Sequence, residues 1–219
     1  MVRIFLFSLL AAAAVRHAAG AEYTINPKES REMTPLYTLH VMPLLPGREA
    51  ELARDAEQLL KDGVCTHVAC KMTLVPEGVP AMDKAAVLGA DYLAFLREFN
   101  GPRDRVGILL QATIGHGWTP DEPCDFRKIV RADGVEEYRM CPLDKNFLVY
   151  LEQQVSALAA LKPAFFMVDD DFRMLTGHTG CMCPLHLAEY ERRTGERHTA
   201  ETLAEAVRND PAARRRRRR

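Results

Sequence analysis

The stretch that decides the fold is residues 163–171, PAFFMVDDD, in which a short apolar run ends in three consecutive carboxylates. Three earlier runs share this character, being short, apolar or β-branched, and followed by polar or turn residues. They are Leu36–Met42, Val64–Leu74 and Val106–Ile114, and the fourth is Ala164–Val168. Such runs are typical of strands in a buried sheet. The sequence therefore predicts four strands.

Helical patterns lie between these strands. Apolar residues recur at helical spacing in Arg48–Asp62, Lys84–Phe99 and Asp144–Leu161. Strands that alternate with helices predict an α/β protein with parallel strands joined by right-handed crossovers. Two architectures fit: a doubly wound open sheet, or the first four units of a (β/α)8 barrel. The first strand is not followed by a glycine-rich dinucleotide loop, which disfavours the nucleotide-binding form of the open sheet.

An insertion follows the third strand. Residues Phe126–Met140 form two alternating segments around Asp133-Gly134, and this pattern predicts a β-hairpin. Cys124 and Cys141 flank the base of that hairpin, so we expect a disulfide between them, the alternative being two unpaired thiols. Cys65 and Cys70, five residues apart on one strand, would point to opposite faces and are predicted to be core residues.

The two ends of the chain differ in composition from its middle. Residues 1–21 combine Arg3, the apolar run Ile4–Val15 and a small-residue cleavage site, which predicts a signal peptide and a secreted or periplasmic protein, the alternative being a buried N-terminal helix. Residues 22–208 would form the partial barrel domain, and residues 209–219 a disordered basic tail. Because the chain outside Arg214–Arg219 is acidic, no nucleic-acid partner is expected, and the mature protein should not be in a membrane.

The residues that follow the strands are the candidates for chemistry, since parallel α/β proteins work at the carboxyl ends of their strands. Asp169, Asp170 and Asp171 are the predicted catalytic residues. Repulsion and partial burial should keep one of them protonated while Arg173 keeps another ionised, a combination that glycosidic bond cleavage needs. The alternative is a solvated acidic turn or a helix N-cap. The candidate substrate-binding residues are His40, Glu77, Gln111, His116, Trp118 and Arg173.

A second cluster combines soft metal ligands. Cys181, Cys183 and His186 offer two thiols and an imidazole within six residues, and His178 is a candidate fourth ligand. Thiolate and imidazole are the ligands of structural zinc sites. A disulfide to another cysteine and a catalytic metal are the alternatives, and no other cofactor is expected.

Three stretches carry a resemblance to a known group of proteins: Gly107–Trp118, Cys141–Asp144 and Pro163–Gly195. They resemble a poorly characterised group of bacterial glycoside-hydrolase-like (β/α)8-barrel proteins over most of residues 36–195. In outline the chain is also similar to clan-A retaining glycosidases, in which the acid/base follows strand four and the nucleophile follows strand seven. The resemblance implies that Asp169–Asp171 occupy the acid/base region. The usual Asn-Glu pair is absent there, and no strand seven follows, so the nucleophile would be missing.

Three functions follow as expectations. The first is a glycoside-hydrolase-like protein, truncated and lacking its nucleophile, that acts on a polysaccharide or glycan. The second is a non-catalytic half-barrel that binds carbohydrate or self-associates through its open sheet edges. The third is a metal-dependent hydrolase that uses His40, His116, His178 and the aspartates.

Overall fold

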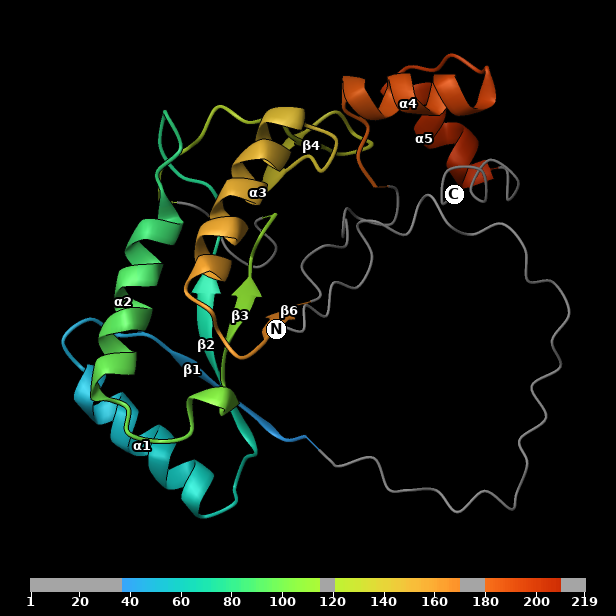
Figure 1. The fold of residues 1–219 in the computed structure, drawn as a ribbon. Coiled ribbons are helices and arrows are strands. Elements are labelled where there is room, and N and C mark those ends of the chain that lie inside the picture. Colours follow the sequence, from blue (N-terminus) through green and yellow to red (C-terminus); the bar gives the residue numbers. More distant parts are fainter. Residues whose placement is uncertain (1–36, 115–120, 170–179, 210–219) are drawn as a thin grey trace, which may run out of the picture.

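The computed structural model describes residues 37–114, 121–169 and 180–209. Its centre is a four-stranded sheet in the order β1-β2-β3-β6, and every neighbouring pair is parallel. The strands are β1 (Leu39–Pro43), β2 (His67–Thr73), β3 (Val106–Gln111) and β6 (Phe166–Val168). The helices α1 (Glu49–Lys61), α2 (Lys84–Glu98) and α3 (Lys145–Ala160) lie between them, with a short 3-10 turn at Arg103–Arg105 before β3 (Figure 1). The predicted α/β class and the four strands are confirmed.

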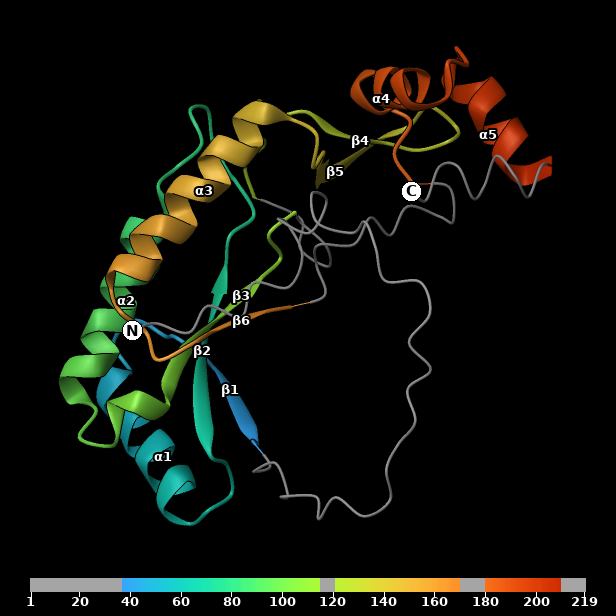
Figure 2. The same ribbon diagram turned by 45° about the vertical axis from the view of Figure 1, so that its right-hand side comes forward.

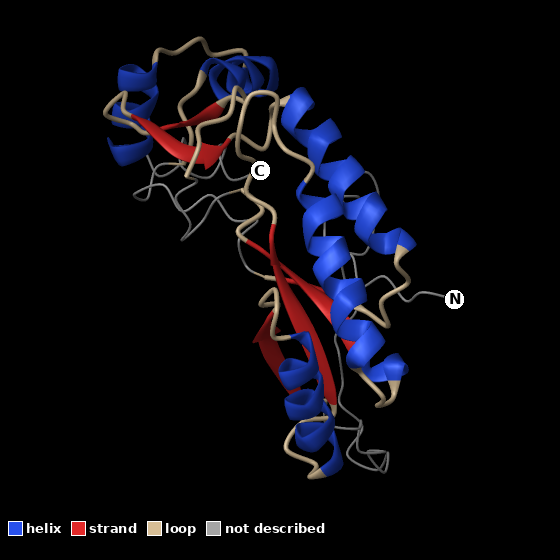
Figure 3. Cartoon of the chain, turned by 90° about the vertical axis from the view of Figure 1, so that its left-hand side faces the viewer, coloured by secondary structure: helices blue, strands red, loops and turns tan. Residues whose placement is uncertain are grey.

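One row of side chains shows how the core is built. Met42, Cys70, Ile108 and Phe166 lie directly opposite one another across the four strands, and all four are buried. They belong to the same core cluster as the inward residues of α1, α2 and α3. Because side chains alternate along a strand, the neighbouring row points to the other face. Within the described residues, the three helices therefore cover one face of the sheet (Figures 2 and 3).

The helix ends follow from local hydrogen bonding. The Asp83 carboxylate accepts a hydrogen bond from the Ala86 N–H at 3.1 Å and caps α2. The Asp144 carboxylate caps α3 through the Asn146 N–H at 2.9 Å, and it also accepts from the Arg127 N–H at 2.7 Å. A side-chain oxygen that satisfies a free N–H in the first turn fixes where a helix begins. The predicted helices are thus confirmed, and each predicted start lies within one residue of the observed N-cap.

The predicted hairpin is also present. Strands β4 (Lys128–Val130) and β5 (Glu136–Met140) pair antiparallel, with an irregular register. Gly134 adopts φ +80° in the connecting turn, and the Arg131 N–H donates to the Val135 carbonyl at 2.8 Å. A positive φ is a conformation that glycine reaches without a steric cost, which is why Asp133-Gly134 marks this turn.

The expected disulfide between Cys124 and Cys141 is wrong. Both are free thiols. The Cys141 N–H bonds the Arg127 carbonyl, so Cys141 lies opposite Arg127 rather than Cys124. The Cys124 sulfur contacts the Met140 sulfur at 3.5 Å in the main core, whereas Cys141 belongs to a separate buried cluster. Cys65 and Cys70 are buried free thiols, as the sequence predicted.

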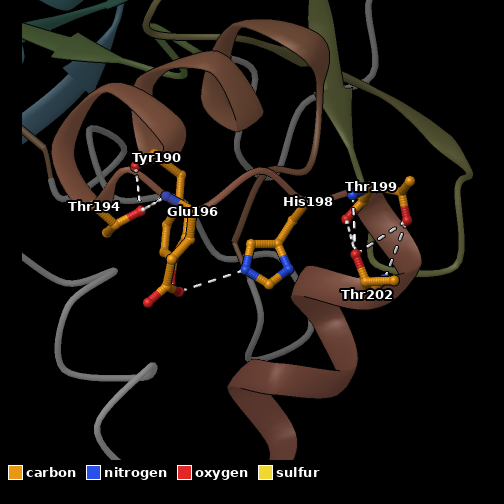
Figure 4. A network of polar contacts seen from close by, with 6 residues as sticks. All are labelled: Tyr190, Thr194, Glu196, His198, Thr199 and Thr202. Carbon is orange, nitrogen blue, oxygen red and sulfur yellow. Dashed lines mark hydrogen bonds and ion pairs between the residues drawn. The ribbon is translucent and has the colours of Figure 1, made fainter.

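Two further helices, α4 (Pro184–Thr194) and α5 (Ala200–Asn209), lie beside the hairpin beyond the sheet (Figure 1). They share a small core in which Tyr190, Leu203 and Val207 are buried. A polar turn joins them: the Thr194 hydroxyl donates to the Tyr190 carbonyl at 2.8 Å and accepts from the Glu196 N–H at 3.1 Å (Figure 4). In the same view, the Thr199 and Thr202 side chains exchange hydrogen bonds with each other's backbone N–H at the start of α5.

The predicted signal peptide and the Arg214–Arg219 run lie outside the described residues. Among the helices that are described, none combines the length and the apolar character needed to span a membrane.

Candidate functional site

Four potential metal ligands converge where the hairpin meets α4. Cys141 follows β5 directly, Cys181 and Cys183 precede α4, and His186 lies in the first turn of that helix. Their ligand atoms all lie within 4.8 Å of one another. The three cysteines are fully buried and His186 is partly buried. In the part of the chain that the structure describes, this is the one such group of His, Cys, Asp and Glu side chains.

Local backbone pairing brings the ligands together. The Met182 N–H donates to the Val130 carbonyl on β4 at 2.7 Å, so the Cys181–Cys183 segment runs along the hairpin. Ile129 and Val130 pack against the three cysteines. Pro184 then occupies the first turn of α4, where a missing N–H costs nothing. The helix therefore begins directly after Cys183, and its first turn carries His186 to the sulfurs.

The spacing of the ligand atoms fits a tetrahedral zinc ion. Zinc lies about 2.3 Å from sulfur and about 2.0–2.1 Å from nitrogen, so tetrahedral ligands are about 3.8 Å apart for two sulfurs and about 3.6 Å apart for sulfur and nitrogen. The Cys141 and Cys183 sulfurs are 3.6 Å apart. Both also face Nδ1 of His186, at 3.5 Å from Cys141 and 3.4 Å from Cys183. These three atoms are thus already spaced as a bound zinc would space them.

The Cys181 sulfur is oriented by the backbone. It accepts hydrogen bonds from the Val130 N–H at 3.5 Å and from the Cys183 N–H at 3.4 Å. Hydrogen bonds of this kind to a ligand sulfur fix its position. The site therefore has outer partners as well as the four ligands.

Three of the four ligands have shifted pKa values in the metal-free cluster. Burial by itself lowers the pKa of His186, but the sulfurs of Cys181 and Cys183 outweigh it and raise that pKa to about 9. Hydrogen bonding to Cys141, Cys181 and His186 lowers the pKa of the Cys183 thiol. The same contacts with Cys181 and Cys183, together with burial, raise the pKa of Cys141. Without a metal these shifts favour protonated Cys141 and His186 beside an anionic Cys183 sulfur, so a metal that binds all four ligands would displace protons from the cluster.

A Cys3His cluster of this kind could bind a metal such as zinc. Sites with four protein ligands are structural, because catalytic zinc keeps one position for water or substrate. The sequence identified Cys181, Cys183 and His186, and the structure brings them together. It missed Cys141 as a ligand, although Cys-Pro recurs at 141–142 and 183–184. The fourth ligand suggested by the sequence, His178, lies outside the described residues.

A second polar arrangement lies at the carboxyl edge of the sheet. The Gln111 amide, at the end of β3, donates to Oδ2 of Asp169 at 3.0 Å. The Asp169 N–H in turn donates to the Leu110 carbonyl at 3.1 Å, so this residue continues the pairing of β6 with β3. By alternation, Gln111 shares a face with Leu109 and Gly107, the face turned away from α1–α3. Two of the predicted site residues are therefore in contact.

Glu77 and His40, predicted to bind substrate, have different surroundings. The Glu77 carboxylate accepts from the Lys84 ammonium at 2.6 Å and from the Asp121 N–H at 3.0 Å. Both of its oxygens are occupied, and it connects the loop after β2 to the loop after β3. His40 is exposed and lies in register with the core residue Val68, so it belongs to the opposite face from Gln111. The structure does not bring either residue to the Gln111–Asp169 contact.

The remaining predicted site residues lie outside the described part of the chain: His116, Trp118, Asp170, Asp171 and Arg173. The alternative of a metal-dependent hydrolase depended on several of these residues. Among the described side chains, His40 takes part in no group of three or more potential metal ligands.

No protein-family model, no curated protein and no solved structure matches the chain.

Proposed function

We propose that the protein carries a structural zinc centre formed by Cys141, Cys181, Cys183 and His186. The observation that carries this proposal is the convergence of three buried thiols and one imidazole, all with ligand atoms within 4.8 Å. The centre would hold α4 and α5 against the hairpin, because its ligands come from both parts. The small shared core of α4 and α5 contains few large side chains, so the free energy of metal binding would add most to stability in this part of the chain.

Zinc content is the direct test. We expect one zinc per chain in protein purified without chelator, measured by native mass spectrometry and by elemental analysis. Cys183→Ser should lose the metal, since it removes one of four ligands. Cys124→Ser is the matched control, because Cys124 is an equally buried thiol in the main core, and it should keep full zinc content. A wild-type chain without zinc after zinc has been supplied during folding would refute the centre.

We further propose, as a second candidate function, that the chain is a glycoside-hydrolase-like protein that works on a polysaccharide or glycan at the carboxyl edge of its sheet. The Gln111–Asp169 hydrogen bond supports this candidate, because it fixes one carboxylate at the strand end where α/β enzymes carry their chemistry.

The strand order and the placement of α1–α3 on one face also support a barrel segment. A doubly wound sheet would reverse its order and carry helices on both faces, whereas successive barrel units add in sequence with their helices outside.

Carbohydrate binding tests this candidate. A glycan array with the wild-type chain should identify a ligand, and Asp170→Ala or Asp171→Ala should weaken its binding. Asp169→Asn should also weaken it, since the Gln111 amide would then meet a neutral side chain. Asp55→Ala, at an exposed position of α1, is the control and should bind normally. Unchanged binding in all three site variants would remove the proposal.

Self-association belongs to the same proposal. Strands β1 and β6 are the edges of the described sheet, and Val41 and Met167 on them are exposed by 40% and 41%. Open edges with apolar side chains favour pairing with a second chain. Native mass spectrometry should then show a dimer or larger species, and a monomer at all concentrations would contradict it. A secreted or periplasmic location remains a prediction from the sequence.

A further inference from the structure

We propose that Cys141 and Cys183 form a disulfide when the centre holds no metal, so that zinc binding and this disulfide are alternative states of one site. The inference concerns regulation and rests in part on the proposed zinc centre. It assigns to Cys141 a disulfide partner other than Cys124, the one expected from the sequence.

Proximity selects this pair. The Cys141 and Cys183 sulfurs are 3.6 Å apart, whereas a disulfide bond is about 2.0 Å long, so the two sulfurs need to approach by about 1.6 Å. The Cys181 sulfur is held as an acceptor by the Val130 and Cys183 N–H groups. Cys181 also lies beside both of these sulfurs, but the two backbone hydrogen bonds hold its sulfur in place, so we assign it as the third thiol.

The other cysteines lie in a different buried cluster. Cys65, Cys70 and Cys124 belong to the main core between the sheet and α1–α3. Cys141 and Cys183 share a separate cluster with Ile129. The fold therefore determines the disulfide partner of Cys141 before oxidation begins.

The chemistry is ordinary thiol–disulfide exchange with a small disulfide such as oxidised glutathione. The thiolate of one cysteine attacks a glutathione sulfur, forms a mixed disulfide and releases one glutathione thiolate. The second protein thiolate then attacks the protein sulfur of that mixed disulfide and releases the other. Two protein thiols lose two electrons and two protons in total, and one glutathione disulfide becomes two glutathione thiols. Only Cys181 and His186 are then left as metal ligands.

Burial sets the rate of this exchange. All three sulfurs are shielded from solvent, so the reagent reaches them only when residues 180–209 move away from the hairpin. A metal that binds both sides of this contact opposes that motion. Oxidation should therefore be slow in the zinc-loaded chain and faster in the metal-free chain.

The test compares these two forms of the full chain in oxidised glutathione. Trypsin separates Cys141, in residues 140–145, from Cys181 and Cys183, in residues 174–192. In the metal-free chain we expect an intact mass lower by about 2 Da and a cross-link between these two peptides. Cys183→Ser should abolish the cross-link while Cys124→Ser retains it, and fragmentation of the linked peptide should place the bond on Cys183.

The outcomes separate the two proposals. A cross-link in the metal-free chain that zinc suppresses at least tenfold in rate supports both. A cross-link in a chain that never binds zinc supports the disulfide and refutes the zinc centre. Bound zinc with no Cys141–Cys183 bond after metal removal and full oxidation refutes the disulfide alone. A bond from Cys141 to Cys124 or to Cys181 also overturns it.

Discussion

Replacing Lys84 by methionine should destabilise the protein through Glu77. The Lys84 side chain is only 10% exposed and that of Glu77 14%, and their charged atoms are 2.6 Å apart. Methionine keeps much of the apolar stem of lysine but removes the ammonium. The carboxylate would then remain in a largely buried place, where it still accepts a hydrogen bond from the Asp121 N–H. Leaving a buried charge unpaired is one of the few effects of a point mutation that cause a large loss of stability.

Removing one member of a buried ion pair costs about 3–5 kcal/mol. We expect the lower end, about 3 kcal/mol, because some solvent reaches the pair and one backbone hydrogen bond persists. For a domain of this size, that loss lowers the melting temperature by about 6–12 °C. The double variant with Glu77→Gln removes both charges, and it should lie within about 1 kcal/mol of wild type.

Urea unfolding of wild type, both single variants and the double variant closes a double-mutant cycle. The expected coupling energy between the two side chains is at least about 2 kcal/mol, because Lys84→Met alone costs about 3 kcal/mol and the double variant at most about 1 kcal/mol. If Lys84→Met alone shifts the free energy of unfolding by less than about 0.5 kcal/mol, the pair is solvated and the reasoning fails. Strict additivity of the two single variants would lead to the same conclusion.

Three more outcomes follow from described contacts. Burial would raise the pKa of Glu77, but Lys84 and the Asp121 N–H lower it overall. The stability that this ionised carboxylate contributes is complete above the pKa of Glu in the unfolded chain and is lost as the pH falls below about 4.3. Melting temperatures of wild type and Glu77→Gln should therefore converge in acid, and parallel curves against pH would contradict this. Gly107→Ala should lower the free energy of unfolding by about 1–3 kcal/mol, because a Cβ there would lie 2.6 Å from the Phe165 ring. In denaturant unfolding, adding Phe165→Leu should restore part of that stability. An unchanged stability of Gly107→Ala would mean that the ring moves freely. Phe95→Ala should cost about 3–5 kcal/mol by the same assay, since Phe95 is fully buried, and a cost below that of Gly107→Ala would show that the core refills the space.

The sequence predicted those elements whose signals are local. Each strand of the four-stranded sheet overlaps a mainly apolar run, and α2 spans Lys84–Glu98 where the helical spacing predicted Lys84–Phe99. Such patterns report burial directly, because a side chain that alternates or recurs every three to four residues must face the core. The Asp133-Gly134 turn was equally local, since it depends on one glycine with positive φ.

The partner of Cys141 was not a local property. It depends on the hairpin register, in which Lys128 faces Met140 and Val130 faces Glu136, and on a segment 40 residues later in the chain. A register change of one residue turns a side chain to the other face, so flanking positions alone cannot select a pair. Helix α5 was also missed, although Leu203, Ala204 and Val207 carry a helical spacing that could have indicated it.

The order of the metal ligands along the chain has a consequence for the edge of the sheet. Cys141 comes before α3 and β6, and Cys181 comes after both. A bond at the centre therefore closes a loop of chain that contains the whole of α3 and the last strand. In the described part of the sheet, strand β6 has three residues and pairs with β3 alone. A short strand at the edge of a sheet frays readily when the chain beyond it is free. A bond that closes this loop limits how far β6 can leave β3, so the state of the centre also affects how firmly the backbone at Asp169 is held.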